Sequence, residues 1–510
     1  MLTVLALLLA CVHRYPFASA SAQAIEVGDE QHDEQFVFVG RWEDVDALSI
    51  FKFDPRSGEL SPRGTESIAG GQLEALLVID DLLVAASNPC DYRDPVSKIC
   101  VNEHSGPMVC SISTLRLSHG PLSGDQPQMT TVSQQWSGGL GPTALALSPT
   151  RELIGVANYQ SGYGSTLPLA PDGALGPSEA STRRMNKTTS LAHFVTFDDT
   201  CPEPRDAAML VVDAGALEFG SFDPRSGAPT SPSVSTGIRV RHVLIRPERG
   251  ILYALYELDG SVGVWPWRGA NSDRDDTDVD ASASADAFMR GQRQQRWCGA
   301  VGAAEIRRAP SAFAAGQCAA VPADEWQPYC TNARGENVTR GFPTEMVLNQ
   351  KGDRLYVTNA MTPPYEAGEA HANGTVAVYD VARGDALRLA QVFAVPPGAR
   401  GLALAPRGDF LITDDPDTGT VASLRLDPSS GLILGVASIA EGVPNAAAIA
   451  VWPRQRASSS LTATVMTTKT TATAEETPPL VAPPCGGLPI RPVCDWLARS
   501  VSRLRGSLGI

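Results

Sequence analysis

Apolar and polar positions alternate along most of the chain, in pairs of short runs separated by Pro, Gly or Asp. One copy, ALALSPTRELIGVANY, begins at Ala144, and others begin at Leu73, His193, His242, Glu345 and Gly401. The copies at 144, 193 and 242 are spaced 49 residues apart. An alternation with a period of two predicts half-buried β-strands rather than helices.

A second pattern lies between these copies, in which an apolar strand runs into a turn. It occurs at 51–60, 221–230, 378–387 and 424–433, and reads FKFDPRSGEL in its first copy. Asp and Pro open such a turn, and Gly supplies the positive φ that closes it. A period near 50 residues made only of short strands predicts a β-propeller with four strands per blade.

A seventh inner strand, AAAIAVWP (446–453), lacks the rest of its blade. The N-terminal run FVFVGR (36–41) can supply the next strand and close the ring, so that no sheet edge is left unpaired. We therefore predict an all-β, seven-bladed β-propeller over residues 35–454. The sequence further predicts a Ser/Thr/Pro-rich linker over 455–484 and a short Cys-containing tail over 485–510, with the C-terminal tail disordered.

Two insertions interrupt the period, at about 88–135 and 270–340. The second opens with NSDRDDTDVDASASAD, in which Asp276, Asp278 and Asp280 alternate like calcium ligands. The sixth position of that loop is Ala281, where a calcium loop needs Gly, so we predict a solvated loop and no metal site.

The start of the chain has the pattern of a secretory signal peptide over residues 1–24, with the apolar run MLTVLALLLAC followed by small residues. A buried N-terminal strand is the alternative. Nine further cysteines, mostly in clusters at 90–110, 298–330 and 485–494, predict disulfides in an oxidising compartment, with one cysteine left over. Glycosylation sequons begin at Asn186, Asn337 and Asn373. We therefore expect a secreted, extracellular glycoprotein.

The charge and the motifs exclude several classes of function. A formal net charge of -15 argues against a nucleic-acid-binding protein, and no apolar run reaches the length of about 20 residues that a membrane span needs. There is no G-x-S-x-G elbow, H-E-x-x-H zinc motif or P-loop.

Three segments resemble the lactonase family of seven-bladed propellers, which includes bacterial-type 6-phosphogluconolactonase and the fungal carboxy-cis,cis-muconate cyclase. They are VANYQSGYGSTLPLAPDGALG (156–176), RVRHVLIRPERGILYALYELDGSVGVW (239–265) and GARGLALAPRGDFLITDDPDTGTVASLRLDPSSG (398–431). The resemblance covers roughly residues 35–454, outside the two insertions.

This resemblance implies a site at one mouth of the central channel. The chain matches the family's site motifs at His193, Arg241, His242, Glu257, Glu345 and Arg400. The family's Ser-Asn-Arg is here Thr358-Asn359-Ala360, so one arginine expected to help hold an anionic substrate is missing.

Opening a lactone requires a base that activates water and donors that stabilise the developing oxyanion. Glu257 or His193 is the expected acid/base. Arg241, His242, Glu345 and Arg400 are the expected substrate-binding residues, and no metal or organic cofactor is expected. We expect a lactonase-like enzyme that opens or forms a lactone, as a lactone hydrolase or a carboxymuconate cyclase-like enzyme does. The predicted substrate is a small anionic lactone of a sugar acid or muconate-type acid, or its open form. Two alternatives stay open: a non-catalytic secreted propeller that binds a glycan or protein at the channel face, and a purely structural Arg241–Glu257 pair.

Overall fold

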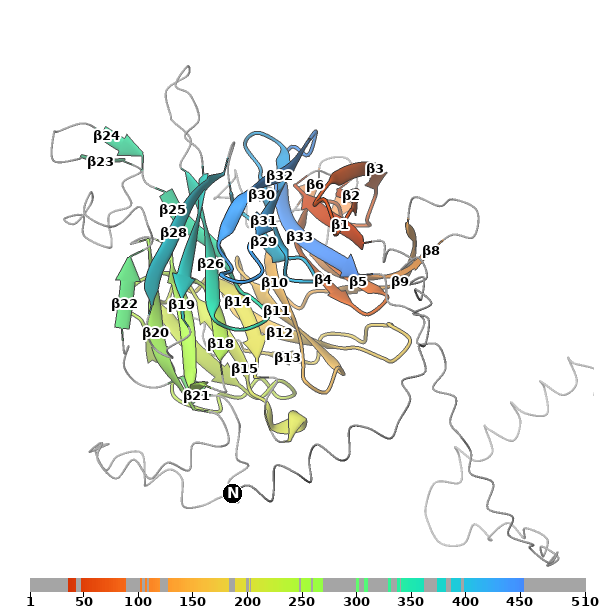
Figure 1. The fold of residues 1–510 in the computed structure, drawn as a ribbon. Helices are drawn as coiled ribbons and strands as arrows, with labels where there is room; N and C mark the ends of the chain where they lie inside the picture. Colours follow the sequence, from red (N-terminus) through yellow and green to blue (C-terminus); the bar gives the residue numbers. More distant parts are fainter. Residues whose placement is uncertain are drawn as a thin grey trace, which may run out of the picture. The chain divides into compact units, whose positions relative to one another are not determined.

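The computed structural model describes residues 35–42, 47–88, 101–102, 106–107, 110–119, 127–182, 189–198, 201, 203–246, 249–257, 260–268, 300–301, 307–310, 329–331, 337–339, 341–361, 374–381, 387–395 and 399–453. Within these ranges, seven antiparallel sheets form the blades of a propeller (Figure 1). The predicted fold class is therefore confirmed.

The blades are numbered here in chain order of their inner strands. Blade 1 contains β4 (Leu73–Ile79), β5 (Leu82–Ser87), β8 (Ser111–His119) and β9 (Pro127–Trp136). Blade 2 contains β10 (Pro142–Leu147), β11 (Leu153–Asn158), β12 (Tyr163–Pro168) and β13 (Ala180–Ser181). Blade 3 contains β14 (Ala192–Phe197), β15 (Met209–Asp213), β16 (Glu218–Phe222) and β17 (Val234–Ser235), with the short helix η2 (Pro204–Asp206) between β14 and β15.

Blade 4 contains β18 (Val240–Arg246), β19 (Ile251–Tyr256), β20 (Ser261–Arg268), β21 (Ala300–Val301) and β22 (Arg307–Pro310). Blade 5 contains β25 (Gly341–Leu348), β26 (Arg354–Met361), β27 (Gly374–Asp380) and β28 (Arg388–Val395). Blade 6 contains β29 (Leu402–Leu404), β30 (Phe410–Asp415), β31 (Thr420–Leu426) and β32 (Ile433–Glu441). Blade 7 contains β33 (Ala446–Pro453), β1 (Gln35–Arg41), β2 (Leu48–Phe53) and β3 (Leu60–Glu66). Two small sheets pair β6 (Val101–Asn102) with β7 (Gly106–Pro107), and β23 (Tyr329–Thr331) with β24 (Asn337–Thr339).

The ring closes through the two ends of the described chain. Each inner strand contacts the next in the order β4, β10, β14, β18, β25, β29, β33, and β33 in turn contacts β4. Strand β1 pairs antiparallel with β33, from Gln35 opposite Pro453 to Arg41 opposite Ala446, and Figure 1 shows the red β1 beside the blue β33. The predicted closure by the N-terminal strand is confirmed.

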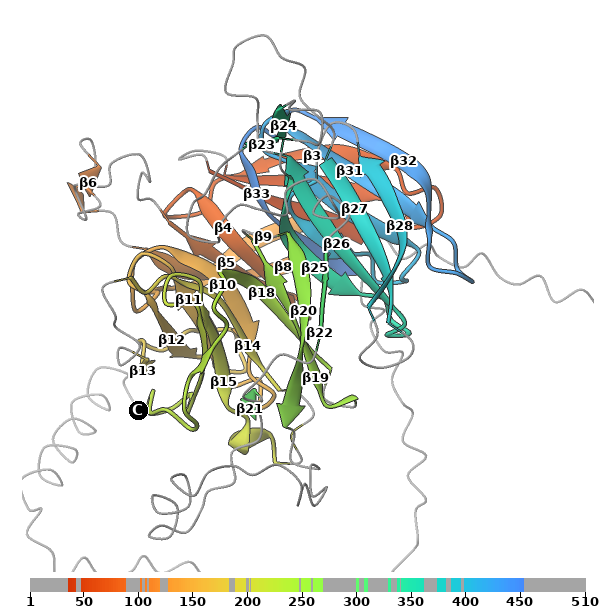
Figure 2. The same cartoon turned by 90° about the vertical axis from the view of Figure 1, so that its left-hand side faces the viewer.

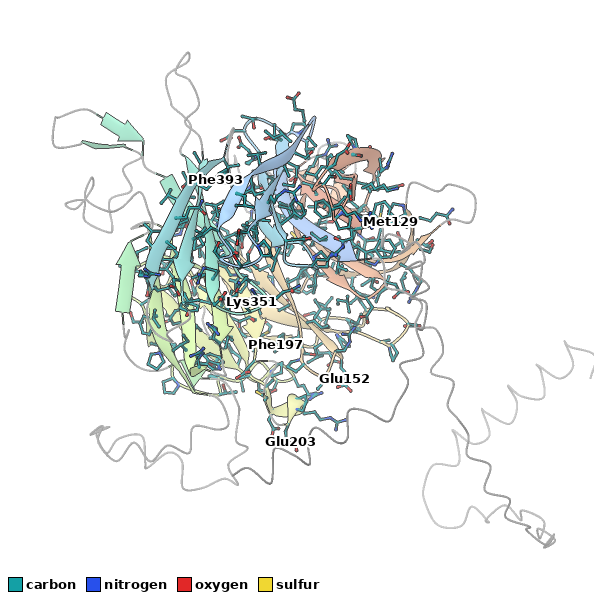
Figure 3. All side chains as sticks on the ribbon, viewed as in Figure 1. Met129, Glu152, Phe197, Glu203, Lys351 and Phe393 are labelled. Atoms are coloured by element: carbon teal, nitrogen blue, oxygen red, sulfur yellow. The ribbon has the colours of Figure 1, made fainter. Side chains whose placement is uncertain are left out.

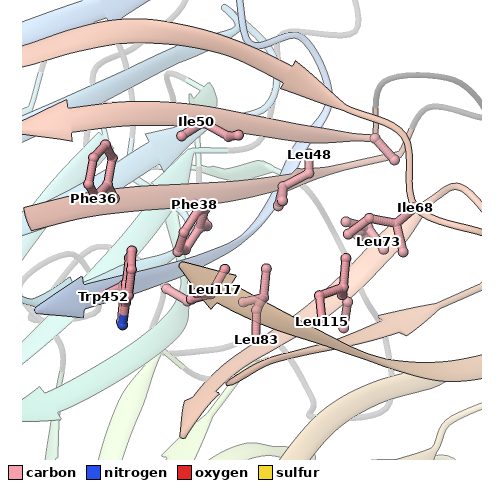
Figure 4. Packing of buried hydrophobic residues seen from close by; sticks show 13 residues of the cluster. Phe36, Phe38, Leu48, Ile50, Ile68, Leu73, Leu83, Leu115, Leu117 and Trp452 are labelled. Atoms are coloured by element: carbon pink, nitrogen blue, oxygen red, sulfur yellow. The ribbon is translucent and has the colours of Figure 1, made fainter. Parts of the chain in front are cut away.

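Apolar side chains fill the space between neighbouring blades, as the alternating pattern requires. Between blades 7 and 1, Phe36, Phe38 and Trp452 pack against Leu83 and Leu115 (Figure 4). The Trp452 ring stacks on Phe36 at 5.9 Å between centroids. Full burial of one such side chain contributes about 1.5–3 kcal/mol. Figure 3 shows the side chains on the strands, and Figure 2 shows the same strands turned by 90° about the vertical axis.

The predicted Asp-Pro turns connect two strands of one blade and pack against the neighbouring blade. In blade 7 the Gly58 N–H donates to the Asp54 carbonyl at 2.8 Å with φ of +80°, as the turn chemistry predicts. A Cβ at Gly58 would collide with the Phe410 ring of blade 6, and the Ser423 hydroxyl donates to the Gly58 carbonyl. Glycine at this position is therefore required both by backbone conformation and by the close approach of the next blade.

The structure corrects the limits of both insertions. Strands β8 and β9 lie within the predicted insertion at about 88–135, yet they are the outer strands of blade 1. Strands β21 and β22 lie within the predicted insertion at 270–340, yet both pair with β20. Because the added residues delay the return of the period, the sequence pattern alone places these outer strands inside the insertions.

Several predictions lie outside the described residues: the signal peptide, the linker, the tail and the Asp276–Asp280 loop. The sequons at Asn186 and Asn373 also lie outside, whereas Asn337 begins β24. Of the described cysteines, Cys201 is disulfide-bonded. Cys110 carries a thiol whose pKa is raised by burial and which donates to Asn88 Oδ1 at 3.7 Å. No helix in the described ranges is long and apolar enough to cross a membrane.

Candidate functional site

The inner strands share an irregularity at the end where they begin. In β4, β10, β14, β18, β25 and β33 the register with the neighbouring strand shifts at the first residues, so that the inner strand carries one extra residue. These extra residues are Glu74, Thr143, His193, Arg241, Glu345 and Ala447. A β-bulge re-aims the side chain of its extra residue. The six strands therefore each direct one residue toward the same space.

That space is a cavity of about 720 Å³, within the usual range for small-molecule sites. All six bulge residues line it, together with Trp42, Gln72, Tyr159, Arg239, Glu257, Arg400 and Asn445. Every blade contributes at least one of these residues. The three arginines and three glutamates of the lining have formal charges that cancel.

Blade 4 provides an ion-paired group that we call the clamp, made of Arg239, Glu257 and Arg241. Arg239 Nε lies 2.9 Å from Glu257 Oε2, and Arg241 Nη1 lies 3.3 Å from Glu257 Oε1. Arg241 Nε also donates to the Thr344 carbonyl of blade 5 at 3.0 Å. Both arginines are thus held in place, and each faces the cavity with donors that a substrate oxygen can accept.

His193 lies beside the clamp as a neutral imidazole. Burial of the ring, with Arg241, Arg239 and His242 nearby, lowers the pKa of His193 well below its usual 6.5. Tyr159 meets the His193 ring edge-on at 5.5 Å between centroids. An imidazole without a proton at neutral pH can accept one from water. We call His193, Tyr159 and the three clamp residues the clamp wall.

His242 does not line the cavity but holds a residue that does. Its Nδ1 lies 2.8 Å from Glu345 Oε2, and its ring packs on Phe194 at 4.0 Å between centroids. Burial raises the pKa of Glu345, but His242, Arg241 and Arg400 outweigh burial and lower it overall. Glu345 is therefore an ionised carboxylate at neutral pH, fixed from behind by His242.

Arg400 faces the cavity from blade 6 in a different setting. Its guanidinium carbon lies 4.1 Å from the centre of the Trp42 ring, and its Nη1 donates to the Ala446 carbonyl at 3.4 Å. Among the described residues it makes no ion pair. With Trp42, Glu74 and Asn445 it forms what we call the anchor wall, contributed by blades 6, 7 and 1. On this wall a guanidinium, positioned by an aromatic ring, keeps donors for an anion.

The structure brings five of the six predicted site residues into one cavity: His193, Arg241, Glu257, Glu345 and Arg400. His242 stands behind them. Ala360, which replaces the expected family arginine, is in β26 opposite Phe342 and is not part of the lining.

Sequence reasoning missed the other lining residues, among them Trp42, Glu74, Thr143, Tyr159 and Arg239. A signal for two of them was present. In the repeat copies, Glu74 and Thr143 occupy the same position as His193, Arg241, Glu345 and Arg400, immediately before the apolar run. Superposing the copies on that position would have identified them. Trp42, Tyr159 and Arg239 lie outside the shared position and have no such signal.

The described residues contain no group of three or more His, Cys, Asp or Glu side chains arranged to hold a metal ion.

A comparison with known proteins shows which family this propeller resembles. A family model described as a lactonase, seven-bladed β-propeller, matches residues 100–313. The resemblance predicted from the three segments is thus confirmed. No curated protein matches the chain.

Solved structures of low sequence identity share the fold. The periplasmic gluconolactonase PpgL of Pseudomonas aeruginosa is 16% identical, with 82% of this chain and 99% of that chain covered and a TM-score of 0.56. A candidate 6-phosphogluconolactonase of Bacteroides fragilis is also 16% identical, with 82% and 98% covered and a TM-score of 0.55. A further candidate 6-phosphogluconolactonase, from Bacteroides uniformis, is 15% identical, with 82% and 99% covered and a TM-score of 0.56.

Proposed function

We propose that this lactonase-family propeller hydrolyses the lactone of a small sugar acid by general base chemistry. The observation that carries the proposal is the neutral His193 beside the clamp, in a cavity whose anchor wall presents Arg400 without an ion pair among the described residues. This combination offers a base for water, donors for an oxyanion and a cation for the carboxylate that forms.

In the proposed reaction, His193 accepts a proton from a water molecule as the water oxygen attacks the lactone carbonyl carbon. Arg241 and Arg239 stabilise the negative charge that develops on the carbonyl oxygen. The bond between the carbonyl carbon and the ring oxygen then breaks, and the ring oxygen takes up a proton. The product is an open hydroxy acid, whose carboxylate Arg400 can bind.

Glu257 is assigned to positioning rather than to proton transfer. Both of its carboxylate oxygens face arginine nitrogens, at 2.9 and 3.3 Å. Accepting a proton on either oxygen would oppose one of these contacts. His193 has no carboxylate contact of this kind in the described structure, so of the two predicted acid/base residues it is the better base.

An unphosphorylated lactone suits the cavity better than a phosphorylated one. Three glutamates balance the three arginines, so a phosphate dianion would meet no net positive charge. The signal-peptide pattern also predicts an extracellular protein, and phosphosugars are cytosolic. Similarity to the fold of a periplasmic gluconolactonase is in keeping with this choice. We accordingly propose secretion, with glucono-δ-lactone or a related aldonolactone as substrate.

The test is hydrolysis of glucono-δ-lactone, its 6-phosphate and a carboxymuconolactone, followed by acid release above the spontaneous rate. His193→Gln serves as the base variant, and Glu152→Gln as the control, because Glu152 pairs with Arg225 on the surface (Figure 3). We expect wild type and control to hydrolyse the unphosphorylated sugar lactone, and His193→Gln to lose about 10²–10⁴-fold in kcat.

Equal rates for His193→Gln and wild type would contradict the proposed mechanism. A preference for the 6-phosphate or the carboxymuconolactone would correct the substrate. No turnover of any of the three by folded protein would overturn the enzyme proposal in favour of a propeller that binds a glycan or protein at its channel face.

A further inference from the structure

Tyr159 lines the cavity and carries a hydroxyl proton to which the proposed reaction assigns no role. It follows β11 directly, and its backbone is fixed by the hydrogen bond from its N–H to the Gly141 carbonyl at 2.7 Å. Arg239 Nη2 donates to the Tyr159 hydroxyl oxygen at 2.7 Å. The hydroxyl proton of Tyr159 has no acceptor among the described residues.

These contacts determine where the hydroxyl of Tyr159 can donate its proton. The oxygen accepts from a guanidinium, so its own O–H is left to donate to another group in the cavity. The Arg239 guanidinium keeps donating to this oxygen after the hydroxyl proton has been transferred. The His193 ring lies edge-on at 5.5 Å, so donor and base line the same wall of the cavity.

We infer that Tyr159 is a catalytic residue, the general acid that protonates the departing ring oxygen of the lactone. This inference rests on the proposed function. As the bond between the carbonyl carbon and the ring oxygen breaks, its electron pair goes to the ring oxygen, which takes the hydroxyl proton of Tyr159. The phenolate then recovers a proton from solvent, while the proton taken from water leaves His193 to solvent. The sum is lactone plus water giving the hydroxy acid.

A second tyrosine in the same blade provides the contrast. Tyr163, four residues further along, donates its hydroxyl to the Gly138 carbonyl at 2.9 Å and is not part of the cavity lining. Its proton is engaged by the backbone, as expected for a structural tyrosine. Tyr163→Phe is therefore the matched control for Tyr159→Phe, because both remove only one hydroxyl oxygen.

The experiment compares two lactones that differ only in the leaving atom, glucono-δ-lactone and its analogue with sulfur in the ring. An alkoxide needs a proton to leave, whereas a thiolate, whose acid has a pKa of about 8.5, leaves without one. For Tyr159→Phe we expect kcat on the oxygen lactone to fall about 10²-fold, with KM within about twofold. On the thiolactone we expect less than about a threefold change. Tyr163→Phe should match wild type on both.

Each contrary result has its own meaning. An unchanged kcat for Tyr159→Phe on the oxygen lactone would overturn the general-acid role and leave the proposed lactonase standing. An equal loss on both lactones would also overturn it, since the hydroxyl would then only position His193 or Arg239. Failure of wild-type protein to hydrolyse either lactone would overturn the proposed function and this inference together.

Discussion

The clamp wall and the anchor wall of the cavity use the same side chain, arginine, in opposite ways. On the clamp wall, Arg239 and Arg241 share the Glu257 carboxylate, and their positions are fixed by it. On the anchor wall, Arg400 rests on the Trp42 ring and makes no ion pair with the described residues. A guanidinium that is already paired is suited to orient reacting groups, whereas one held by an aromatic face can still bind an incoming anion. The first wall should therefore control the rate of the chemical step, and the second the affinity for the anionic product.

The largest expected effect comes from breaking the clamp with Arg241→Ala. The substitution removes a donor to the oxyanion, one of the two partners of Glu257 and the bond to the Thr344 carbonyl. We expect a loss of about 10³-fold in kcat/KM, mostly in kcat. Steady-state kinetics on the best lactone of the panel measures it. Arg225→Ala, which removes a surface pair with Glu152, should keep wild-type kinetics. A pure KM effect for Arg241→Ala would show that the two walls do not differ.

A smaller effect, on product binding, is expected from Arg400→Gln. The lactone is neutral and the carboxylate belongs to the product, so loss of a charge-assisted hydrogen bond of about 1.5–3 kcal/mol should raise the inhibition constant of gluconate about 10–100-fold and leave kcat within about threefold. The matched control is Arg425→Gln, because Arg425 also lies over an aromatic ring, that of Phe410 at 4.7 Å, but is not part of the lining. A fall in kcat with an unchanged inhibition constant for gluconate would place Arg400 in the chemical step instead.

The pH dependence of kcat/KM tests the environment of His193 on the clamp wall. Because burial and the arginines lower the pKa of His193 well below 6.5, the base stays unprotonated as the pH falls through 6.5. We expect kcat/KM to change by less than about twofold between pH 7.5 and 6.0, where an ordinary histidine would lose about three-quarters of its free base. An anion bound at Arg400 should offset the positive charges and raise the pKa of His193. NMR titration of the imidazole with and without gluconate measures this shift, and a decrease on binding would contradict it.

The smallest effect concerns stability rather than activity. Burial raises the pKa of Asp414, beneath the anchor wall, from 3.8 to about 6, although the Gly401 N–H and Arg400 oppose the rise. A pKa raised on folding gives stability that is fully present below pH 3.8 and is lost as the pH rises through 6. Asp414→Asn keeps an acceptor for the Gly401 N–H and removes this loss, so it should stabilise the protein at pH 8 by up to about 3 kcal/mol.

Thermal unfolding at pH 8 and pH 4 checks the prediction for Asp414. The gain in Tm of Asp414→Asn over wild type should be present at pH 8 and largely absent at pH 4. A gain of equal size at both pH values would mean that the carboxyl group does not titrate as its burial requires.

The sequence predicted the strands of the blades more fully than the residues of the clamp wall and the anchor wall. The repeated apolar runs gave seven inner strands, and the single leftover strand at 446–453 required an N-terminal partner, which β1 provides. The Asp-Pro-Gly turns carried their own chemistry, so Gly58 could be assigned a positive φ in advance. These features are local, because each one is determined by residues that are adjacent in the sequence.

The cavity depends on contacts between residues that are far apart in the sequence, and these contacts cannot be inferred from adjacent residues. A β-bulge adds one residue without breaking the alternation that follows, so nothing at His193 or Arg241 alone shows that the side chain is turned inward. The pairing of Arg239 with Tyr159 joins blades 4 and 2, and that of Arg400 with Trp42 joins blades 6 and 7. Only the closed ring brings these partners together.

Ring closure by β1 and β33 also means that the propeller cannot be completed until late in translation. Strand β1 leaves the ribosome early, but its partner β33 is made some 400 residues later, which takes about 20–80 s at ordinary rates of translation. During that interval the edge of β1 lacks its partner, and the cavity lacks Ala447 and Asn445. The nascent chain must keep an apolar strand from pairing elsewhere, and the cavity lining stays incomplete until β33 has been synthesised.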